Sequence, residues 1–275
     1  MTTLKAALVQ LRTPATQAAA LAHATPLVRE AAAAGAQLIA TPEGTNILQR
    51  DKARLFEAVR PLEEDECVLG LRALARELEV WILIGSALVR REDGQLANRS
   101  TLIGADGEVK ATYDKIHMFD VDLPTGERHR ESSLYTPGER AAVAQTPWGK
   151  IGLSVCYDVR FPHLYRGLAK AGAEIITVPA AFTRPTGEAH WEILLRARAI
   201  ETGAFVLAPA QGGFHEDGRG TWGRSTIIGP WGEILAKAED DEPQVILADL
   251  DLDAVGKARA AIPALVNDRA FAEPS

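Results

Sequence analysis

Short apolar segments alternate with longer alanine-rich or amphipathic segments along the chain, and this alternation predicts an α/β fold. Apolar runs of the kind that form strands buried on both faces occur at residues 6–10, 37–41, 80–85, 151–155, 174–178 and 204–208. The segments between them predict helices at residues 17–34, 64–78, 162–171 and 188–202. Two of these helices are followed by glycine, at Gly35 and Gly172, as helix ends often are.

Parts of the chain repeat each other in the same order. Residues 99–109 read RSTLIGADGEV and residues 224–234 read RSTIIGPWGEI, with seven of eleven positions identical. A second pair reads GAQLIATP at 35–42 and GAEIITVP at 172–179. Similar strands also resemble each other by chance, but pairs that keep their order favour a duplicated unit. The Asp106-Gly107 and Trp231-Gly232 pairs would form the turn of one hairpin in each half.

The repeat predicts two related halves, at about residues 1–120 and 146–255, joined by a polar stretch at 121–145. Each half is interpreted as β-α-β-α-β-β, a mixed sheet with two helices on one face. The other sheet faces are apolar and would pack against each other, which predicts a four-layer α-β-β-α sandwich. The length of 275 residues allows one large domain or two small ones. The repeat favours a single domain over residues 1–275.

Composition narrows the class of protein. The formal net charge is −7. This charge argues against nucleic-acid binding, because contacts with phosphates need an excess of basic residues. A hydrophobic share of 47% argues against a disordered chain. No apolar run has the roughly 18–20 residues of a membrane span, and the N-terminus has no signal-peptide pattern. We therefore expect a cytoplasmic protein with no membrane contact.

The two cysteines, Cys67 and Cys156, have different surroundings. Cys156 ends the apolar run at 151–155 and precedes a helix that begins near Pro162. A thiol held there, near the positive end of a helix, is a candidate nucleophile with a lowered pKa. A buried, inert thiol is the alternative, and Cys67 fits it. A distant histidine could supply the base, but no histidine pair has a metal-binding spacing, so we expect no metal and no other cofactor.

The repeat also singles out two charged residues. Glu43 follows a buried strand at a position where the second half has Ala180, so the fold itself does not require an acid there. Lys115 follows the first hairpin, where the second half has Asp240. Either residue alone would more often be a solvated surface charge. Their occurrence together with Cys156 makes the three a candidate catalytic set.

This set resembles the nitrilase, or carbon–nitrogen hydrolase, superfamily over about residues 4–270. The resemblance rests on five motifs in order: Pro42-Glu43-Gly44, Asp114-Lys115-Ile116-His117, Val155-Cys156-Tyr157-Asp158-Val159-Arg160-Phe161-Pro162, Ala189-His190-Trp191 and Pro230-Trp231-Gly232-Glu233. The α-β-β-α sandwich of that superfamily agrees with the fold expected from the repeat. Residues 113–120, 195–202 and 210–212 are most similar to the ω-amidase and deaminated-glutathione amidase branch.

The resemblance implies a catalytic role for each member of the set. Glu43 would be the general base, Lys115 the stabiliser of the oxyanion, and Cys156 the nucleophile that forms a thioester. A second glutamate is implied in the loop after the lysine, where Glu127 and Glu131 both fit. The Glu131-Ser132 pair matches the related amidases, so Glu131 is the expected residue.

The implied substrate is a small carboxylate-bearing amide that is cleaved with release of ammonia. The residues implied to bind it are Tyr157, Arg160, Phe182 and Thr186. Arg160 would either hold the substrate carboxylate or pair with Asp158 or Glu43. Arg224 stands where the branch commonly has histidine, and it either reaches the pocket mouth or is structural, as its repeat counterpart Arg99 suggests.

Other interpretations stay open. The helix at 188–202 carries either a core-facing apolar stripe or an outer patch for self-association, and we expect a homodimer or a larger homo-oligomer. A nitrile or N-carbamoyl hydrolase would use the same motifs. A non-catalytic thiol-based binding or redox-sensing protein is the alternative of another class. The presence of Glu43 and Lys115 argues against it, since a sensor needs neither.

Overall fold

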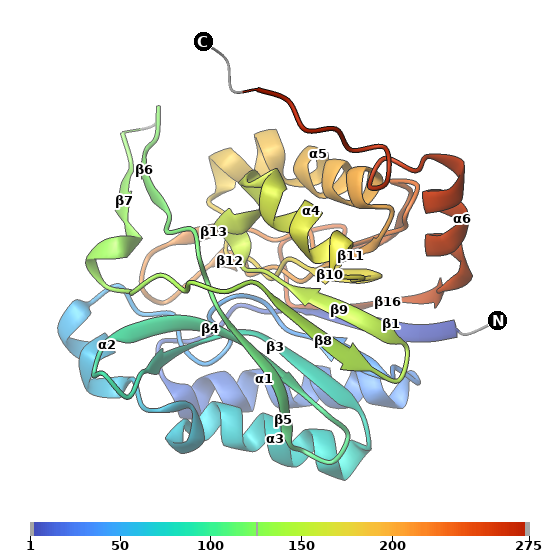
Figure 1. The fold of residues 1–275 in the computed structure, drawn as a ribbon. Helices are drawn as coiled ribbons and strands as arrows, with labels where there is room; N and C mark the ends of the chain where they lie inside the picture. Colours follow the sequence, from blue (N-terminus) through green and yellow to red (C-terminus); the bar gives the residue numbers. More distant parts are fainter. Residues whose placement is uncertain (1–2, 125, 273–275) are drawn as a thin grey trace.

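The computed structural model describes residues 3–124 and 126–272 (Figure 1). Two six-stranded sheets lie face to face in the middle of the molecule, and helices cover their outer faces. This arrangement confirms the four-layer α-β-β-α sandwich. Within the described ranges, none of the helices combines the length and the apolar character that a membrane span requires.

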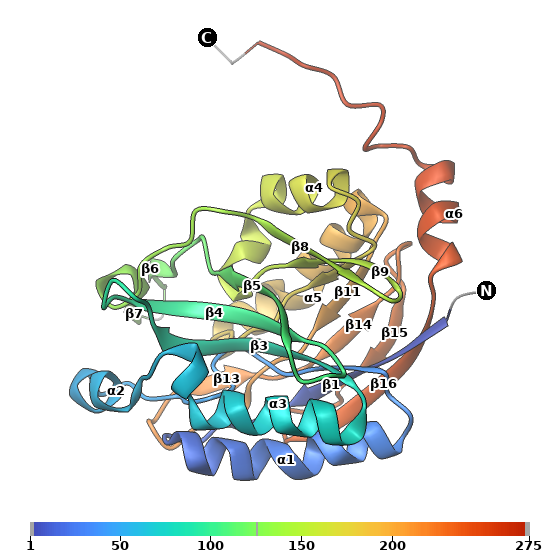
Figure 2. The same ribbon diagram turned by 60° about the horizontal axis from the view of Figure 1, so that its bottom comes forward.

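The first sheet is built mainly from the first half of the chain. Its strands, in spatial order, are β16 (Gln244–Asp251), β1 (Thr3–Gln10), β2 (Leu38–Ala40), β3 (Trp81–Arg90), β4 (Leu96–Ile103) and β5 (Val109–Asp114). The three central strands β1, β2 and β3 are parallel, and the flanking pairs are antiparallel. Helices α1 (Gln17–Ala33) and α3 (Glu66–Leu78) cover its outer face (Figure 2).

The second sheet repeats this plan. Its strands, in spatial order, are β8 (Ala142–Thr146), β9 (Gly149–Leu153), β10 (Ile175–Thr177), β11 (Phe205–Ala208), β14 (Thr226–Ile228) and β15 (Ile234–Lys237). Strands β9, β10 and β11 are parallel, as β1, β2 and β3 are. Helices α4 (Pro162–Lys170) and α5 (Arg184–Thr202) lie over this sheet (Figure 1). The two sheets therefore share one plan, as the sequence repeat predicted.

The boundaries of the two halves differ from the prediction at both ends of the second half. Strand β16 pairs with β1 along eight register positions, so residues 244–251 return to the first sheet rather than stay with the second half. Strand β8 takes the equivalent edge of the second sheet and begins at Ala142, inside the expected linker. Each half consequently holds a longer run of strands than β-α-β-α-β-β. Strand β16 follows the second half in the chain but pairs with β1 of the first sheet, and so it links the two halves.

Helix boundaries also differ where proline and glycine obscured the pattern. Helix α5 begins at Arg184, four residues earlier than expected, because Pro185 lies in its first turn, where proline is tolerated. Further elements lie outside the predicted set. They are α2 (Lys52–Ala58), the hairpin of β6 (Asp120–Asp122) and β7 (Arg128–Arg130), the hairpin of β12 (Gly212–Phe214) and β13 (Gly220–Trp222), strand β16 and the terminal helix α6 (Asp253–Ala261). The β6–β7 hairpin projects from the side of the sandwich (Figure 1).

Burial on both faces explains the continuous apolar strands. In β1, Ala6 and Leu8 face the core between the two sheets, whereas Ala7 and Val9 face α1 and α3. The small residues of α1 let the helix lie close to the sheet. Cys67 is packed in this outer layer of the core, as expected of an inert thiol. The rigid sheets direct the ends of β2, β5 and β9 toward one edge, where the candidate residues lie.

Candidate active site

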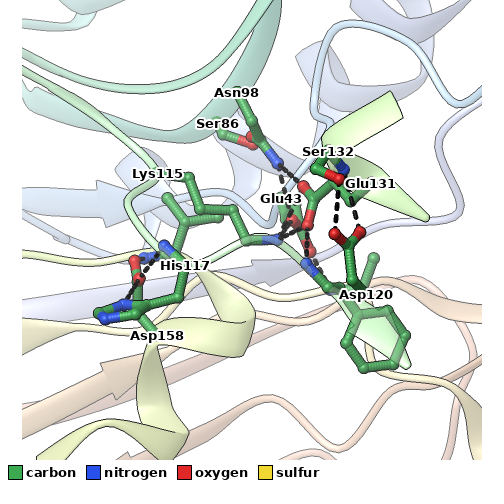
Figure 3. A network of polar contacts seen from close by, with 12 residues as sticks. Glu43, Ser86, Asn98, Lys115, His117, Asp120, Glu131, Ser132 and Asp158 are labelled. Carbon is green, nitrogen blue, oxygen red and sulfur yellow. Dashed lines mark hydrogen bonds and ion pairs between the residues drawn. The ribbon is translucent and has the colours of Figure 1, made fainter. Parts of the chain in front are cut away.

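The three candidate residues and a fourth, Glu131, meet in one buried site. Figure 3 shows Glu43, Lys115 and Glu131 in this site. Glu43 follows β2, Lys115 follows β5, and Cys156 follows β9. The Lys115 ammonium lies 3.0 Å from Glu43 Oε1 and 2.8 Å from Glu131 Oε2, with a side chain that is only 2% exposed. The structure therefore joins residues that are up to 113 positions apart between Glu43 and Cys156.

Cys156 lies in a constrained turn. Its φ of 52° is in the left-handed region, where a side chain other than glycine is strained. The turn is the start of a short 3₁₀ segment, Cys156–Arg160, and the Cys156 N–H donates to the Pro179 carbonyl at 2.8 Å. Cys156 is 7% exposed and lines the cavity that also contains Glu43 and Lys115. Backbone strain of this kind often marks a functional position.

Asp158 holds the turn in place and links it to the loop of Lys115. Its carboxylate accepts hydrogen bonds from the Val155 N–H at 2.8 Å and the Tyr113 hydroxyl at 2.7 Å. His117 Nδ1 lies 2.6 Å from Asp158 Oδ1 (Figure 3). The motifs around Lys115 and Cys156 are thus tied by one fully buried carboxylate.

The charges of the site act on one another. Burial alone would lower the pKa of Lys115, but the Glu131 and Glu43 carboxylates raise it well above its ordinary value. Burial alone would raise the pKa of Glu43, but Lys115 and hydrogen bonds from Cys156, Lys115 and Asn98 bring it below its ordinary value. Lys115 is therefore a cation and Glu43 an anion at neutral pH.

The thiol is protonated in the resting site. Burial and the neighbouring Glu43 carboxylate raise the pKa of Cys156 well above its ordinary value, against the opposing effect of Lys115. The expectation of a thiol with a lowered pKa is therefore wrong. The positive end of helix α4 begins only at Pro162, while the Glu43 carboxylate lies beside the sulfur.

Of the two glutamates considered for the fourth position, the structure brings Glu131 to Lys115. Both Glu131 oxygens contact Nζ, at 2.9 and 2.8 Å, and Oε2 also accepts the Phe119 N–H at 2.6 Å. Glu127 lies farther along the hairpin loop, with Oε2 3.5 Å from His129 Nε2. Both glutamates line the same cavity, but of the two only Glu131 contacts Lys115.

Asn98, in β4, is a site residue that sequence reasoning missed. Its side-chain amide donates to Glu43 Oε1 at 2.8 Å and to Glu131 Oε1 at 3.3 Å. The repeat contained the signal, since the counterpart of Asn98 in the second half is Gly223. A comparison of the halves at every position, rather than only at charged residues, would have found it.

A cavity of about 800 Å³ opens above these residues. Three of the four predicted substrate-binding residues line it: Tyr157, Phe182 and Thr186. Arg160 is not among the described residues of its wall. The Arg160 guanidinium instead lies 5.9 and 5.4 Å from the ring centroids of Tyr157 and Phe182, and Nη1 is 3.3 Å from His190 Nδ1. The expected pairing of Arg160 with Asp158 or Glu43 is replaced by these contacts.

Other cations line the cavity. They are Arg50, Arg128, Arg130, Arg184 and Arg219. Four of them form ion pairs: Arg128 and Arg130 with Asp122, Arg184 with Asp241, and Arg219 with Asp217. Arg50 has no ion pair among the described residues. No cluster of three or more acidic, histidine or cysteine side chains suited to a metal occurs in the described part of the chain.

Arg224 contacts two tryptophans, Trp191 and Trp222. Its carbonyl accepts the Trp191 indole N–H at 2.9 Å, and its guanidinium lies 5.7 Å from the Trp222 ring centroid. The repeat counterpart Arg99 forms a two-point ion pair with Asp114 instead. Arg224 is not among the described residues that line the cavity, which favours its structural interpretation.

Residues 5–260 match the family model described as carbon-nitrogen hydrolase, and the chain belongs to this family. It is 47% identical to a deaminated glutathione amidase from Yersinia enterocolitica over 213 residues, which are 75% of this chain and 73% of the relative. It is 36% identical to the omega-amidase NIT2 of Xenopus tropicalis over 96% of this chain and 94% of the relative. The chain is thus a carbon–nitrogen hydrolase of the amidase type.

Among solved structures, the NitFhit protein of C. elegans superposes with a TM-score of 0.90 and 31% identity over 97% of this chain. The chain spans only 65% of the length of that protein. This similarity independently supports the α-β-β-α sandwich.

The charge of Glu43 should control the thiol. Glu43→Gln is expected to lower the pKa of Cys156, because it removes a neighbouring negative charge and leaves Lys115 in place. The thiolate absorbance in the ultraviolet, followed against pH in a Cys67→Ala background, measures this change. Glu127→Gln, which removes a cavity carboxylate away from Lys115, should leave it unaltered. A Cys156 pKa that stays the same or rises in Glu43→Gln would contradict the electrostatic account.

Proposed function

We propose that this enzyme hydrolyses a small carboxylate-bearing amide at Cys156 through a thioester and releases ammonia. The observation that carries the proposal is the buried contact of one carboxylate, Glu43, with both the Lys115 ammonium and the Cys156 thiol. Such a carboxylate can move a proton between the nucleophile and the leaving group while the ammonium stabilises charge on oxygen.

In the first step Glu43 takes the thiol proton, and the sulfur forms a bond to the amide carbon. The carbonyl π electrons move to oxygen, where the Lys115 charge and the Tyr157 backbone N–H stabilise the oxyanion. Preorganised donors of this kind contribute about 3–4 kcal/mol each. Attack and proton removal are coupled, because the resting thiol is neutral.

In the second step the oxyanion collapses and the carbon–nitrogen bond breaks. Glu43 gives its proton to the nitrogen, ammonia leaves, and a thioester of Cys156 remains. Glu43 then takes a proton from water, which attacks the thioester carbon. The carbon–sulfur bond breaks, and the sulfur regains its proton from Glu43. Glu131 keeps Lys115 charged and in position throughout.

The relatives and the cavity support the substrate class. The two curated relatives are named for amides of small acids, deaminated glutathione and ω-amides. The cationic side chains around the cavity suit a substrate carboxylate, although the net charge of the chain is −7. A nitrile or N-carbamoyl hydrolase would use the same four residues and is the second candidate. A redox sensor is disfavoured, because sensor thiols have a low pKa and that of Cys156 is raised.

Removal of the nucleophile or base should abolish turnover. Cys156→Ala is expected to lower kcat/KM by about 10⁴-fold or more, and Glu43→Gln by about 10²–10⁴-fold. Ammonia release from α-ketoglutaramate, deaminated glutathione and simple aliphatic amides is the assay, with Cys67→Ala as the control that keeps activity. Full activity of Cys156→Ala would refute the mechanism. Carbon dioxide released with ammonia, or turnover of nitriles alone, would point to the second candidate.

The position of Arg160 behind the aromatic wall generates a separate prediction. Arg160→Met should reduce turnover of carboxylate-bearing and neutral amides by the same factor, about 2- to 30-fold, because it loses cation–π support of Tyr157 and Phe182. Steady-state kinetics on a matched pair of amides measure this. A rise in KM confined to the carboxylate-bearing amide would instead show that Arg160 binds the substrate carboxylate, as the resemblance implied.

We further propose that the enzyme is a cytoplasmic homodimer that associates through the outer face of α5 and the β14–β15 turn. Ile193, Ile200 and Trp231 are 71%, 53% and 59% exposed, and Ile200 lies against Gly232 of that turn. Burial of such a patch against a second copy favours association. The two free cysteines suit a reducing compartment.

Charged substitutions in this patch should separate the subunits. Sedimentation velocity is expected to give a dimer for the wild type and a monomer for Ile193→Glu/Ile200→Glu. Leu69→Glu, at an exposed apolar position of α3 on the opposite outer layer, is the control that should remain dimeric. A wild-type monomer, or an unaffected double variant, would rule out this interface.

A further inference from the structure

We infer that Asn98 is a positioning residue that holds the Glu43 and Glu131 carboxylates together beside the single Lys115 ammonium and keeps Glu43 available as a base. The inference rests on the proposed function, because it concerns the availability of Glu43 as a base. Asn98 is only 3% exposed, and its amide nitrogen reaches one oxygen of each glutamate, at 2.8 and 3.3 Å. The backbone carbonyl of Asn98 also accepts a hydrogen bond from the backbone N–H of Lys115 at 2.9 Å.

The charge balance of the site creates the need for such a residue. Two carboxylates share one ammonium in a buried site, which leaves an excess negative charge. Like charges in that position favour uptake of a proton by one of them. Ala181 N–H and Phe119 N–H each donate to an Oε2 atom, at 2.9 and 2.6 Å. The Oε1 atoms of both glutamates depend on Lys115 and on Asn98.

Asn98 supplies hydrogen bonds without a proton that can be lost. A side-chain amide nitrogen carries two N–H groups, and here both are directed at carboxylates. Reversal of the amide would turn its oxygen toward two negative charges, so the network fixes its orientation. Removal of Asn98 therefore leaves the two glutamates with one shared cation and makes a trapped proton more favourable.

The side-chain oxygen of Asn98 shows that packing alone does not account for an asparagine at this position. Asn98 Oδ1 is buried and has no hydrogen-bond partner among the described residues. A buried acceptor without a partner destabilises the fold. The repeat counterpart Gly223 carries no side chain, and the second half has no equivalent of Glu43 or Lys115. The amide occurs only in the half that contains Glu43 and Lys115.

The test is the pH profile of kcat/KM for amide hydrolysis. In Asn98→Leu and the smaller Asn98→Ala, activity should be about tenfold below the wild type on the acid side. It should approach the wild type on the alkaline side, because Glu43 must lose a trapped proton before it can act. Asn98→Asp adds a third carboxylate and should move the acid limb further.

Thr101→Val is the matched control. Thr101 lies on the same strand, is buried, and its hydroxyl also lacks a partner among the described residues. Its loss should leave the pH profile unchanged. A uniform loss of activity at every pH in the Asn98 variants, or no loss, would overturn the inference and leave Asn98 a structural residue.

Infrared spectroscopy of the resting protein separates this inference from the proposed function. Asn98→Leu should show an added band of a protonated carboxyl group at neutral pH, and Glu43→Gln or Glu131→Gln in that background should remove it. The band does not depend on any substrate. Its absence in both Asn98→Leu and Asn98→Ala would refute the role of Asn98, even if amide hydrolysis by Cys156 were established.

Discussion

One buried ammonium between two carboxylates is the interaction on which the rest of the site depends. Lys115 is held within 3.0 Å of Glu43 and 2.8 Å of Glu131. An ion pair at such depth is costly unless every charge has partners. The backbone N–H groups of Ala181 and Phe119 and the Asn98 amide provide them. The site is thereby charged and rigid before any substrate arrives.

The duplicated fold makes the site rigid. Comparison of its two halves also identifies the candidate catalytic residues. Equivalent strands in both sheets end at one edge of the sandwich, and the inner sheet faces share one core. In the first half that edge carries Glu43, Asn98 and Lys115, whereas the second half has Ala180, Gly223 and Asp240. The second half contributes Cys156. Positions that differ between the halves are therefore the candidates for a functional role, because positions that agree reflect what the shared fold requires.

Much of this could be predicted from the chain, and the failures have physical causes. Buried strands and the repeat identified the sandwich, because both faces of β1 and its equivalents are apolar. Strand β16 was missed as part of the first sheet, since pairing between distant segments leaves no local pattern. The raised pKa of Cys156 was missed because it depends on the distance to Glu43, not on the helix that follows. Arg160 has the right charge but lies behind the aromatic wall.

The central claim is that Cys156 carries the acyl group during turnover. The most direct measurement is intact-protein mass spectrometry of the enzyme quenched in acid within one turnover of an amide substrate. The account predicts an added mass equal to the substrate minus ammonia, located on the peptide that contains Cys156 and released by hydroxylamine. Turnover with no adduct at any quench time, or an adduct on another residue, would contradict it.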